Sequence, residues 1–301
     1  MTTEAVLTEP HDGSKVDQRR QLGAAMRRYR KEAGIDREAA AALIDVSGPT
    51  LSRKESGEIK FKPLEVDRLA ITYGISADRV GELLGLAGEV RSGSGRSELP
   101  SFLSMRSRMF IELERHKAVE ILTATLTYIP LYFQTERYMR ALWLAHGEGL
   151  SPQRTDELVM LRKRRQEVLT KAGPPAIRAI IHEMAIRLPV GGPDVMQEQL
   201  VALAAACDLP QVEVLVQPIA AGAYPGMDST GRLLGFADGP TSDLLQVQLF
   251  DQVTYHPHSE TSKAFRAGWA RRKASALDPV RSKALILGTA AEFAAENSHS
   301  E

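Results

Sequence analysis

The stretch Ile35–Glu58, IDREAAAALIDVSGPTLSRKESGE, decides how the first quarter of this chain folds. It indicates two short helices joined by a tight turn, and the second helix begins within Val46–Arg53, VSGPTLSR. Two helices joined by so short a turn form a helix-turn-helix, whose second helix enters the major groove of DNA. The other three quarters of the chain then have to be explained as the part that controls this activity.

Helix-start and helix-stop signals extend this unit on both sides. Leu22 and Met26 fall at helical spacing, and Gly34 follows them as a stop signal. Asp36 and Ser47 are the expected N-caps of the second and third helices, because their side chains can accept hydrogen bonds from free backbone N–H groups. The five helices are expected at about 17–32, 36–44, 47–56, 63–73 and 76–86.

The side chains free to reach base edges belong to the outward face of the third helix. Leu51 is expected to point inward at helical spacing. Thr50, Ser52 and Arg53 should then point outward, and Arg53 can form a bidentate pair with guanine. The predicted DNA-binding residues, including those expected to approach phosphates, are Arg37, Ser47, Gly48, Thr50, Ser52, Arg53, Lys54 and Lys60.

Charge supports this interpretation locally but not globally. The 301 residues hold 38 Lys and Arg against 38 Asp and Glu, so no global field attracts nucleic acid or membrane. Between Asp17 and Lys62, however, eleven basic residues stand against seven acidic ones. This local excess has the sign needed for contact with phosphates. A small helical bundle with a solvated basic face is the alternative.

Cys207 is the only cysteine, which excludes a disulfide within the chain and disfavours a cysteine-based zinc site. It lies in an apolar run, and we expect it to be a small core residue. No apolar run approaches the roughly 18 residues needed to span a membrane, and the polar N-terminus lacks the features of a signal peptide. We therefore expect a cytoplasmic protein with no membrane contact, associated with the nucleoid when it is bound to DNA.

The spacing of apolar residues along the sequence predicts an α+β protein, with an all-α helix-turn-helix domain followed by a mixed α+β domain. Helices of the second domain are expected at about 102–117, 135–146, 151–171, 193–207 and 259–277, and strands at about 119–126, 176–181, 212–216, 233–237, 244–250 and 253–256. The predicted organisation is a disordered tail (1–16), the helix-turn-helix domain (17–90), a Gly/Ser-rich linker (91–99), an α+β regulatory domain (100–276) and a C-terminal helix and tail (277–301).

Several enzyme motifs begin in this sequence and are not completed. His182-Glu183 starts like the helix of zinc proteases, but the second histidine that the motif requires is Ile186. The glycine-rich segments 191–193 and 222–226 do not continue as phosphate-binding loops. No Ser or Cys lies in a recognisable nucleophile elbow. We therefore predict no enzymatic activity, no catalytic residues, no metal site and no cofactor.

One segment of the second domain is richer in aromatic residues than the chain average of 6%. Its members are Tyr128, Tyr132, Phe133, Tyr138 and Trp143. Packing in the core around a strand-to-helix junction is one interpretation of this segment. The other is the wall of a pocket or groove for a ligand or a partner. These five residues are therefore the candidates for partner or ligand binding.

Blocks of sequence, taken in order, resemble a known family. Leu22 to Gly57 resembles the helix-turn-helix of the xenobiotic-response-element (XRE) family. The remainder resembles the domain of unknown function that follows it in WhiJ-like regulators of filamentous actinobacteria. The downstream blocks are Ile129-Pro130 with Gln134–Ala141, Arg165–Thr170, Leu188–Met196, and Leu209-Pro210 with Val212–Pro218 and Ala221–Ala223.

The resemblance implies a transcriptional regulator, antitoxin-like and without enzymatic activity, that is often encoded beside a small BldB-like partner protein. Double-stranded operator DNA and such a partner are therefore the expected binding partners. Two departures concern the recognition unit. The usual turn glycine is Asp45, which can also adopt the left-handed conformation. The usual apolar residue after Arg53 is Lys54, which either loosens the recognition helix or adds a phosphate contact.

The sequence is compatible with more than one mode of action. A symmetric operator would require a homodimer, and no coiled-coil pattern in the sequence specifies one. The second domain is either the receiver of a small protein or a small-molecule sensor with a pocket of its own. A protein-interaction module whose helix-turn-helix no longer reads DNA is the third possibility.

Overall fold

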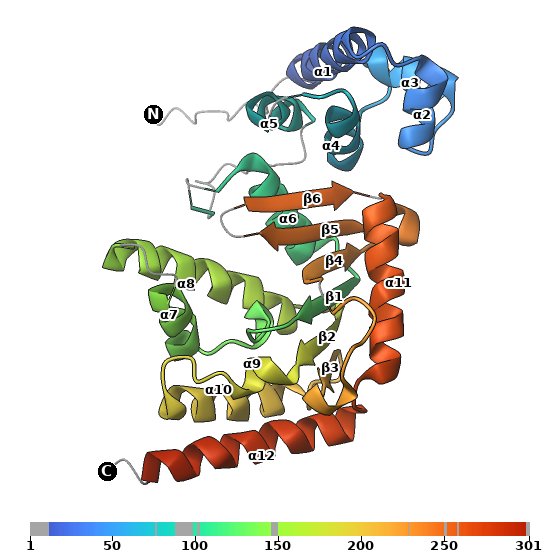
Figure 1. The fold of residues 1–301 in the computed structure, drawn as a ribbon. Helices are drawn as coiled ribbons and strands as arrows, with labels where there is room; N and C mark the ends of the chain where they lie inside the picture. Colours follow the sequence, from blue (N-terminus) through green and yellow to red (C-terminus); the bar gives the residue numbers. More distant parts are fainter. Residues whose placement is uncertain are drawn as a thin grey trace, which may run out of the picture. The chain divides into compact units, whose positions relative to one another are not determined.

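The computed structural model describes residues 12–75, 77–87, 99–100, 103–145, 150–227, 229–249, 252–257 and 259–298. Much of the predicted tail, nearly all of the predicted linker and the last three residues lie outside this description. The chain divides into two compact units, Met1–Glu98 with Phe102–Met109 and Leu99–Ser101 with Phe110–Glu301. Figure 1 draws the elements of both units as a ribbon.

The first unit is helical throughout its described part. Its elements are α1 (Asp12–Glu32), α2 (Arg37–Leu43), α3 (Gly48–Glu55), α4 (Pro63–Thr72) and α5 (Ala77–Leu86). Helix α1 begins at Asp12, inside the segment predicted as a disordered tail, and this part of the prediction is wrong. The segment from Asp12 to Asp17 contains no proline that would interrupt a helix, and the nearest proline in the sequence is Pro10.

Left-handed backbone conformations end these helices at the predicted places. Gly34 and Gly74, which follow α1 and α4, both have a φ of 67°. Asp45, in the turn between α2 and α3, has a φ of 53° and is the only non-glycine residue with positive φ in the described part of the chain. The prediction that Asp45 takes the place of a turn glycine is therefore confirmed.

The second unit is a mixed α+β domain, as predicted. Its elements are α6 (Met105–His116, which begins in the first unit), β1 (Glu120–Thr125), η1 (Leu131–Phe133), α7 (Glu136–Ala145), α8 (Pro152–Gln166), η2 (Glu167–Leu169), β2 (Ala176–His182), α9 (Glu183–Arg187), α10 (Pro193–Ala206), β3 (Val212–Gln217), η3 (Ile219–Ala221), β4 (Gly231–Gly235), η4 (Pro240–Ser242), β5 (Leu244–Leu249), β6 (Gln252–Pro257), α11 (Glu260–Ser275) and α12 (Pro279–Ser298).

The six strands form one mixed sheet in the order β3-β2-β1-β4-β5-β6. Strands β1, β2 and β3 are parallel, and β4, β5 and β6 continue the sheet antiparallel. Parallel neighbours need a crossover, and α7 with α8 and α9 with α10 form the two crossovers here. Strand β4 ends at Gly235, two residues before the predicted end, because a turn closes between Phe236 and Gly239.

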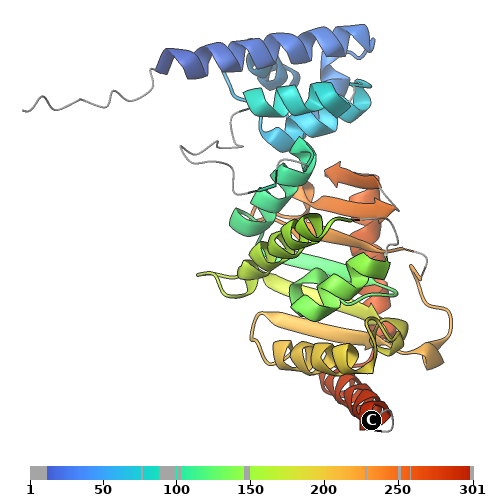
Figure 2. The same cartoon turned by 90° about the vertical axis from the view of Figure 1, so that its left-hand side faces the viewer.

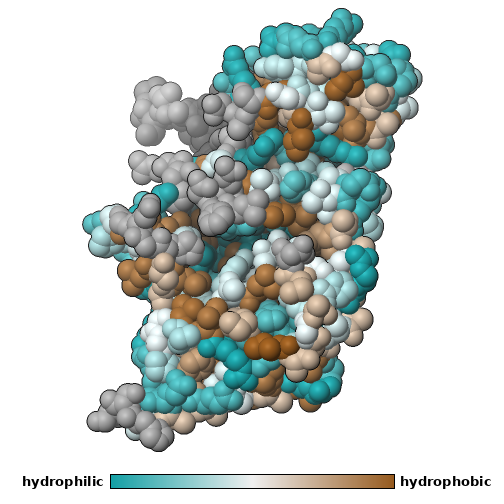
Figure 3. All heavy atoms as spheres, viewed as in Figure 1, coloured by the Kyte–Doolittle hydropathy of each residue, from teal (hydrophilic) through white to brown (hydrophobic). Residues whose placement is uncertain are grey.

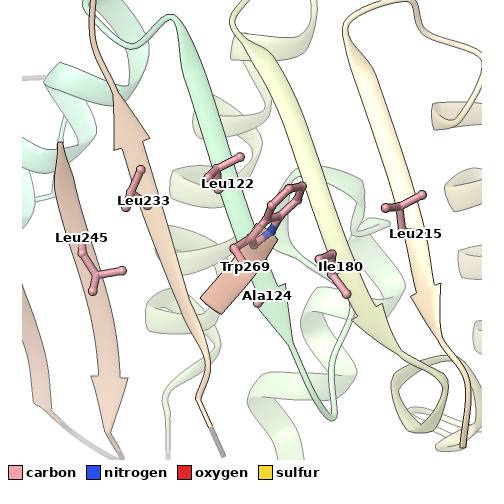
Figure 4. Packing of buried hydrophobic residues seen from close by; sticks show 7 residues of the cluster. All are labelled: Leu122, Ala124, Ile180, Leu215, Leu233, Leu245 and Trp269. Atoms are coloured by element: carbon pink, nitrogen blue, oxygen red, sulfur yellow. The ribbon is translucent and has the colours of Figure 1, made fainter. Parts of the chain in front are cut away.

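Helix α11 covers one face of the sheet. Trp269 of α11 lies over the strands, and its indole N–H donates to the Thr123 carbonyl at 3.3 Å. Trp269 and the strand residues beneath it form one hydrophobic cluster, drawn in Figure 4, whose members are Leu122, Ala124, Ile180, Leu215, Leu233, Leu245 and Trp269. Because side chains alternate along a strand, the residues next to these in sequence face the other side of the sheet.

The crossover helices cover that other face, and Figure 2 shows α7, α8 and α10 in front of the strands. Helix α12, predicted as a separate C-terminal element, packs against α10 and β3 and belongs to the second unit. The Ser282 hydroxyl of α12 accepts a hydrogen bond from the Val216 amide of β3 at 2.9 Å. None of the helices in the described part of the chain combines the length and the apolar composition that a membrane span needs.

A buried carboxylate joins the elements on the crossover-helix face. Glu114 of α6 is 0% exposed and accepts two hydrogen bonds from Arg165 of α8, at 2.6 and 2.7 Å. The Tyr132 hydroxyl of η1 donates to the same carboxylate. Burial alone would raise the pKa of Glu114, but attraction and hydrogen bonding by Arg165 outweigh it, so the pKa lies below its usual range.

Replacing this carboxylate tests how much the pair stabilises the second unit. We expect Glu114→Gln to lower the free energy of unfolding by about 3–5 kcal/mol at pH 7, because Arg165 stays buried without a counter-charge. Urea unfolding followed by tryptophan fluorescence is the measurement, since both tryptophans, Trp143 and Trp269, lie in this unit. Glu112→Gln, on the same helix but at a more exposed pair, should change little.

The pH dependence has a definite sign. Because the pKa of Glu114 is lower in the folded than in the unfolded protein, its stabilisation is fully present above the unfolded pKa of about 4.3 and is lost as pH falls. The difference in the free energy of unfolding between wild type and Glu114→Gln should therefore become smaller below that pH. A difference that stays constant between pH 7 and pH 3 would contradict this account.

Candidate nucleic-acid interface

The helix-turn-helix is held at its ends by the side chains that the sequence indicated. Asp36 Oδ1 accepts from the Ala39 amide at 2.8 Å, which caps α2. Ser47 Oγ accepts from the Thr50 amide at 3.3 Å, which caps α3, and Pro49 lies in the first turn of α3. Both caps satisfy N–H groups that would otherwise lack a partner at a helix start.

Helix α3 packs closely against α1. Leu51 of α3 is 0% exposed, which confirms its predicted inward orientation. Gly23 of α1 allows the close approach, because a Cβ at this position would lie 2.6 Å from the carbonyl oxygens of Lys54 and Glu55. A side chain on α1 at this point would therefore push the recognition helix away.

A buried ion pair fixes the same two helices. Arg30 of α1 donates to both carboxylate oxygens of Glu55, from Nε at 2.6 Å and from Nη2 at 2.9 Å. The hydrogen bond that Arg30 donates to Glu55 raises the pKa of Arg30 above its ordinary value. The sequence carried a signal for this role, since Arg30 continues the helical spacing of Leu22 and Met26, which are both buried.

Lys54 does not belong to the DNA-facing surface, and its predicted role is wrong. Its side chain is 6% exposed and its ammonium donates to Glu65 at 2.8 Å and to the Lys60 carbonyl at 2.9 Å. Phe61 lies beneath the charge, with 5.6 Å between Nζ and the ring centroid. Position 54 follows Leu51 by one helical turn and therefore faces inward, where Lys54 ties α3 to the start of α4.

The outward face of α3 presents the other predicted side chains. Ser52 and Arg53 are exposed, and Thr50 is half-buried with its hydroxyl 2.9 Å from Ser47 Oγ. The Arg53 side chain is 60% exposed and lies 3.5 Å from Glu58. A surface pair of this kind is weakly held, so the guanidinium can leave Glu58 for a stronger acceptor.

The remaining predicted residues surround the start of α3. Arg37, at the first turn of α2, is exposed and pairs with Glu38 at 3.2 Å. Gly48 is buried, and a Cβ there would lie 2.5 Å from a carboxylate oxygen of Glu38. Lys60 is exposed beyond the end of α3. Figure 3 shows hydrophilic atoms over much of the described surface of α1 as well.

The aromatic candidates separate into two groups. Tyr132, Phe133 and Tyr138 are buried in the core, where the Tyr138 hydroxyl accepts from the Ile129 amide at 3.1 Å. The core-packing interpretation therefore holds for these three, and their candidacy as partner-binding residues is wrong. Tyr128 and Trp143 are half-buried, and Arg162 lies over the Trp143 ring at 4.4 Å.

The residues of the incomplete enzyme motifs have structural partners. His182 caps α9 by accepting from the Met184 amide, and Glu183 accepts from Arg187 and from the Ile219 amide. Cys207 is half-buried, and burial raises the pKa of its thiol. Within the part of the chain that the structure describes, no three His, Cys, Asp or Glu side chains are grouped so as to hold a metal ion.

Comparisons with known proteins match two separate parts of the chain. A family model described as a helix-turn-helix domain matches residues 21–83. A second model, described as a domain of unknown function (DUF5753), matches residues 107–288, which is more than half of the chain. No curated protein and no solved structure matches the chain significantly. The prediction of a helix-turn-helix followed by a domain of unknown function is thus confirmed.

The Arg30–Glu55 pair makes a testable contribution to the recognition unit. We expect Arg30→Met to destabilise the first unit by about 3–5 kcal/mol, because Glu55 is left buried and unpaired. Hydrogen exchange of the full chain, read at the amides of α1 and α3, measures this locally. Arg28→Met is the matched control, since Arg28 is 62% exposed and pairs loosely with Glu32 at 3.7 Å. Equal exchange in the two variants would contradict the assignment.

Proposed function

Because the chain belongs to the DUF5753 family and carries a helix-turn-helix domain ahead of that region, we propose that it is a sequence-specific transcriptional regulator. A DNA-binding regulator is the general class that the helix-turn-helix domain indicates. The observation that carries the specific proposal is the outward face of α3. There Ser52 and Arg53 are exposed, while Lys54 and Glu55, the next two residues, are fixed inward by ion pairs.

The proposed contacts follow from this orientation. Arg53 exchanges its surface pair with Glu58 for the O6 and N7 atoms of a guanine in the major groove. Arg37 and the first turn of α2 approach a backbone phosphate, which the positive end of a helix dipole favours. Ser47, Thr50 and Lys60 complete the contact surface, with Gly48 at the start of α3.

Replacing Arg53 tests the recognition directly. A binding site is first selected from a random-sequence duplex pool with the wild-type protein, and affinity is then measured by fluorescence anisotropy. We expect Arg53→Ala to weaken binding to the selected site about tenfold to a hundredfold and to relax the preference at one base pair, because a bidentate guanine contact is lost.

Two further variants make that result specific. Arg79→Ala removes an equally exposed arginine from α5, where it pairs with Glu82, and should leave the affinity unchanged. Lys54→Met should lower the stability of the first unit without altering the base preference, because its ammonium faces Glu65. If Arg53→Ala binds the selected site as tightly as wild type at every salt concentration, direct readout by α3 is wrong.

The DUF5753 region is proposed to receive the signal that controls DNA binding, by binding a small BldB-like partner protein in an antitoxin-like, WhiJ-like arrangement. Exposed apolar side chains on α7, on α8 and between these two helices support a partner interface at this helix pair. Leu144 is 78% exposed, Met160 52% and Leu150 40%. A partner that prefers the DNA-free form lowers the occupancy of the operator, and only to the extent of its differential affinity for the two states.

Co-purification tests this part of the proposal. Tagged full-length protein is recovered from the native lysate after nuclease treatment, with the triple substitution Leu144→Ser, Leu150→Ser and Met160→Ser as the matched control. We expect a stoichiometric small protein with wild type and its loss with the substituted protein, because the apolar contact surface is removed. Recovery of the same small protein by both would place the interface elsewhere. Recovery by neither would contradict partner control.

A further inference from the structure

Three arginines and one glutamate form a cluster on the crossover-helix face of the sheet. Arg162 and Arg165 come from α8, Arg232 from β4 and Glu114 from α6. Leu233 packs on the α11 face, so its neighbour Arg232 points to the opposite side. Arg165 and Arg232 both attract the negative charge of Glu114, and both repel the positive charge of Arg162. The cluster therefore holds three positive charges and one negative charge.

The two arginines that do not bind Glu114 have neutral acceptors. Arg162 Nη1 donates to the Gln134 amide oxygen at 2.6 Å, and its guanidinium lies over the ring of Trp143. Arg232 Nη1 donates to the Gln246 amide oxygen at 2.7 Å. Within the described ranges, no carboxylate forms an ion pair with Arg162 or Arg232. Neutral amides thus occupy the positions where acidic residues would cancel the charge.

Both amides are oriented by a second hydrogen bond. Gln134 Nε2 donates to the Ile129 carbonyl at 2.6 Å, and Gln246 Nε2 lies 3.3 Å from the Tyr255 hydroxyl. Each therefore presents its oxygen to an arginine. The two arginines are positioned by these contacts to neutral groups, and neither is matched by a carboxylate of its own among the described residues.

Keeping this charge out of water has a cost that the fold does not offset. Burial and repulsion by Arg165 and Arg232 lower the pKa of Arg162 to about 10, well below that of an ordinary arginine. The Nε of Arg232 is buried and has no hydrogen-bond acceptor. A partly buried cation without a counter-charge destabilises a protein, and a bound anion would remove that destabilisation.

We propose that Arg162 and Arg232, with Arg165 behind them, form a binding site for a small oxyanion, a carboxylate or a phosphate group carried by a diffusible ligand. The planar fork of a guanidinium matches the oxygens of either group, and two such forks can hold one anion between them. This site gives the DUF5753 region a ligand class, and it goes beyond the DNA-binding function.

The surroundings fit a small ligand. Figure 3 shows the surface hollowed between α8 and the strands. Tyr128 and Trp143, the two half-buried members of the aromatic segment, lie near Arg162, so the body of a ligand would meet aromatic rings. The aromatic segment thus contributes two rings at the edge of the proposed site, and the arginines would recognise the charged group of the ligand.

Calorimetric titration of the full-length protein tests the site without DNA, so its failure and a failure of DNA binding are distinguishable. Inorganic phosphate and succinate are the two probes, each at the ionic strength of a sodium chloride reference. We expect saturable binding of at least one of them. Phosphate alone would identify a phosphorylated ligand, and succinate alone a carboxylate ligand. Heats equal to those of chloride for both probes would overturn the proposal.

Substitutions locate the binding. Arg162→Gln and Arg232→Gln should each weaken binding at least about tenfold, because a hydrogen bond to a charged group is lost. Arg154→Gln, an equal charge change on the same helix at a half-buried arginine that pairs with Glu157, should leave binding unchanged. Arg162→Lys keeps the charge but not the fork and should weaken binding less. Binding as tight as wild type in both glutamine variants would overturn the assignment.

The free protein provides a second readout. Without an anion, Arg162→Gln should raise the melting temperature or leave it unchanged, because a partly buried charge with no ion-pair partner is removed. Added probe should raise the melting temperature of wild type only. A lower melting temperature in Arg162→Gln, with no effect of probe on wild type, would show that this arginine serves packing alone.

Discussion

A charge removed from water must find an opposite charge, and this constraint determines how the helices of the second unit meet the sheet. Glu114 is fully enclosed, so three elements are built to compensate it: α8 through Arg165, η1 through Tyr132, and β4 through the field of Arg232. These elements are distant in sequence, and the pairing favours one arrangement of them over others of equal hydrophobicity. The charge of Glu114 is matched by these groups, whereas the neighbouring Arg162 has no carboxylate partner among the described residues.

The same constraint sets the orientation of the recognition helix. Helix α3 is short, from Gly48 to Glu55, and a helix of this length has little stability of its own. Its last two residues face inward, where Glu55 meets Arg30 of α1 and Lys54 meets Glu65 of α4. These two pairs hold the rotation of α3 about its axis, and that rotation decides which side chains are presented outward. Specific base reading by Arg53 would therefore depend on charges that never contact DNA.

Local patterns were sufficient for most of the secondary structure, because caps, glycine stops and periodicity act over a few residues. Ser47, Ser151 and Ser259 each cap the helix that they were expected to begin. The sequence does not indicate the strand order, because pairing β1 with β2 on one side and β4 on the other depends on contacts far apart in the chain. The inward orientation of Lys54 cannot be recognised from the sequence for a related reason. A lysine on a basic, helical stretch suggests a solvated face, and only tertiary packing turns it inward.

The contrast between paired and unpaired cations also gives the two units a common physical logic. Cations matched inside the protein, such as Arg30 and Arg165, act on stability and cannot bind anything else without unfolding their surroundings. Cations held only by a weak surface pair or by a neutral amide, such as Arg53 and Arg162, keep most of their attraction for an outside anion. On α3 that anion would be DNA, and on α8 a small oxyanion. A ligand bound at α8 can influence DNA binding only if it favours one of two states of the protein, so an effect of oxyanion on DNA affinity would imply that the second unit has a state that this cluster distinguishes.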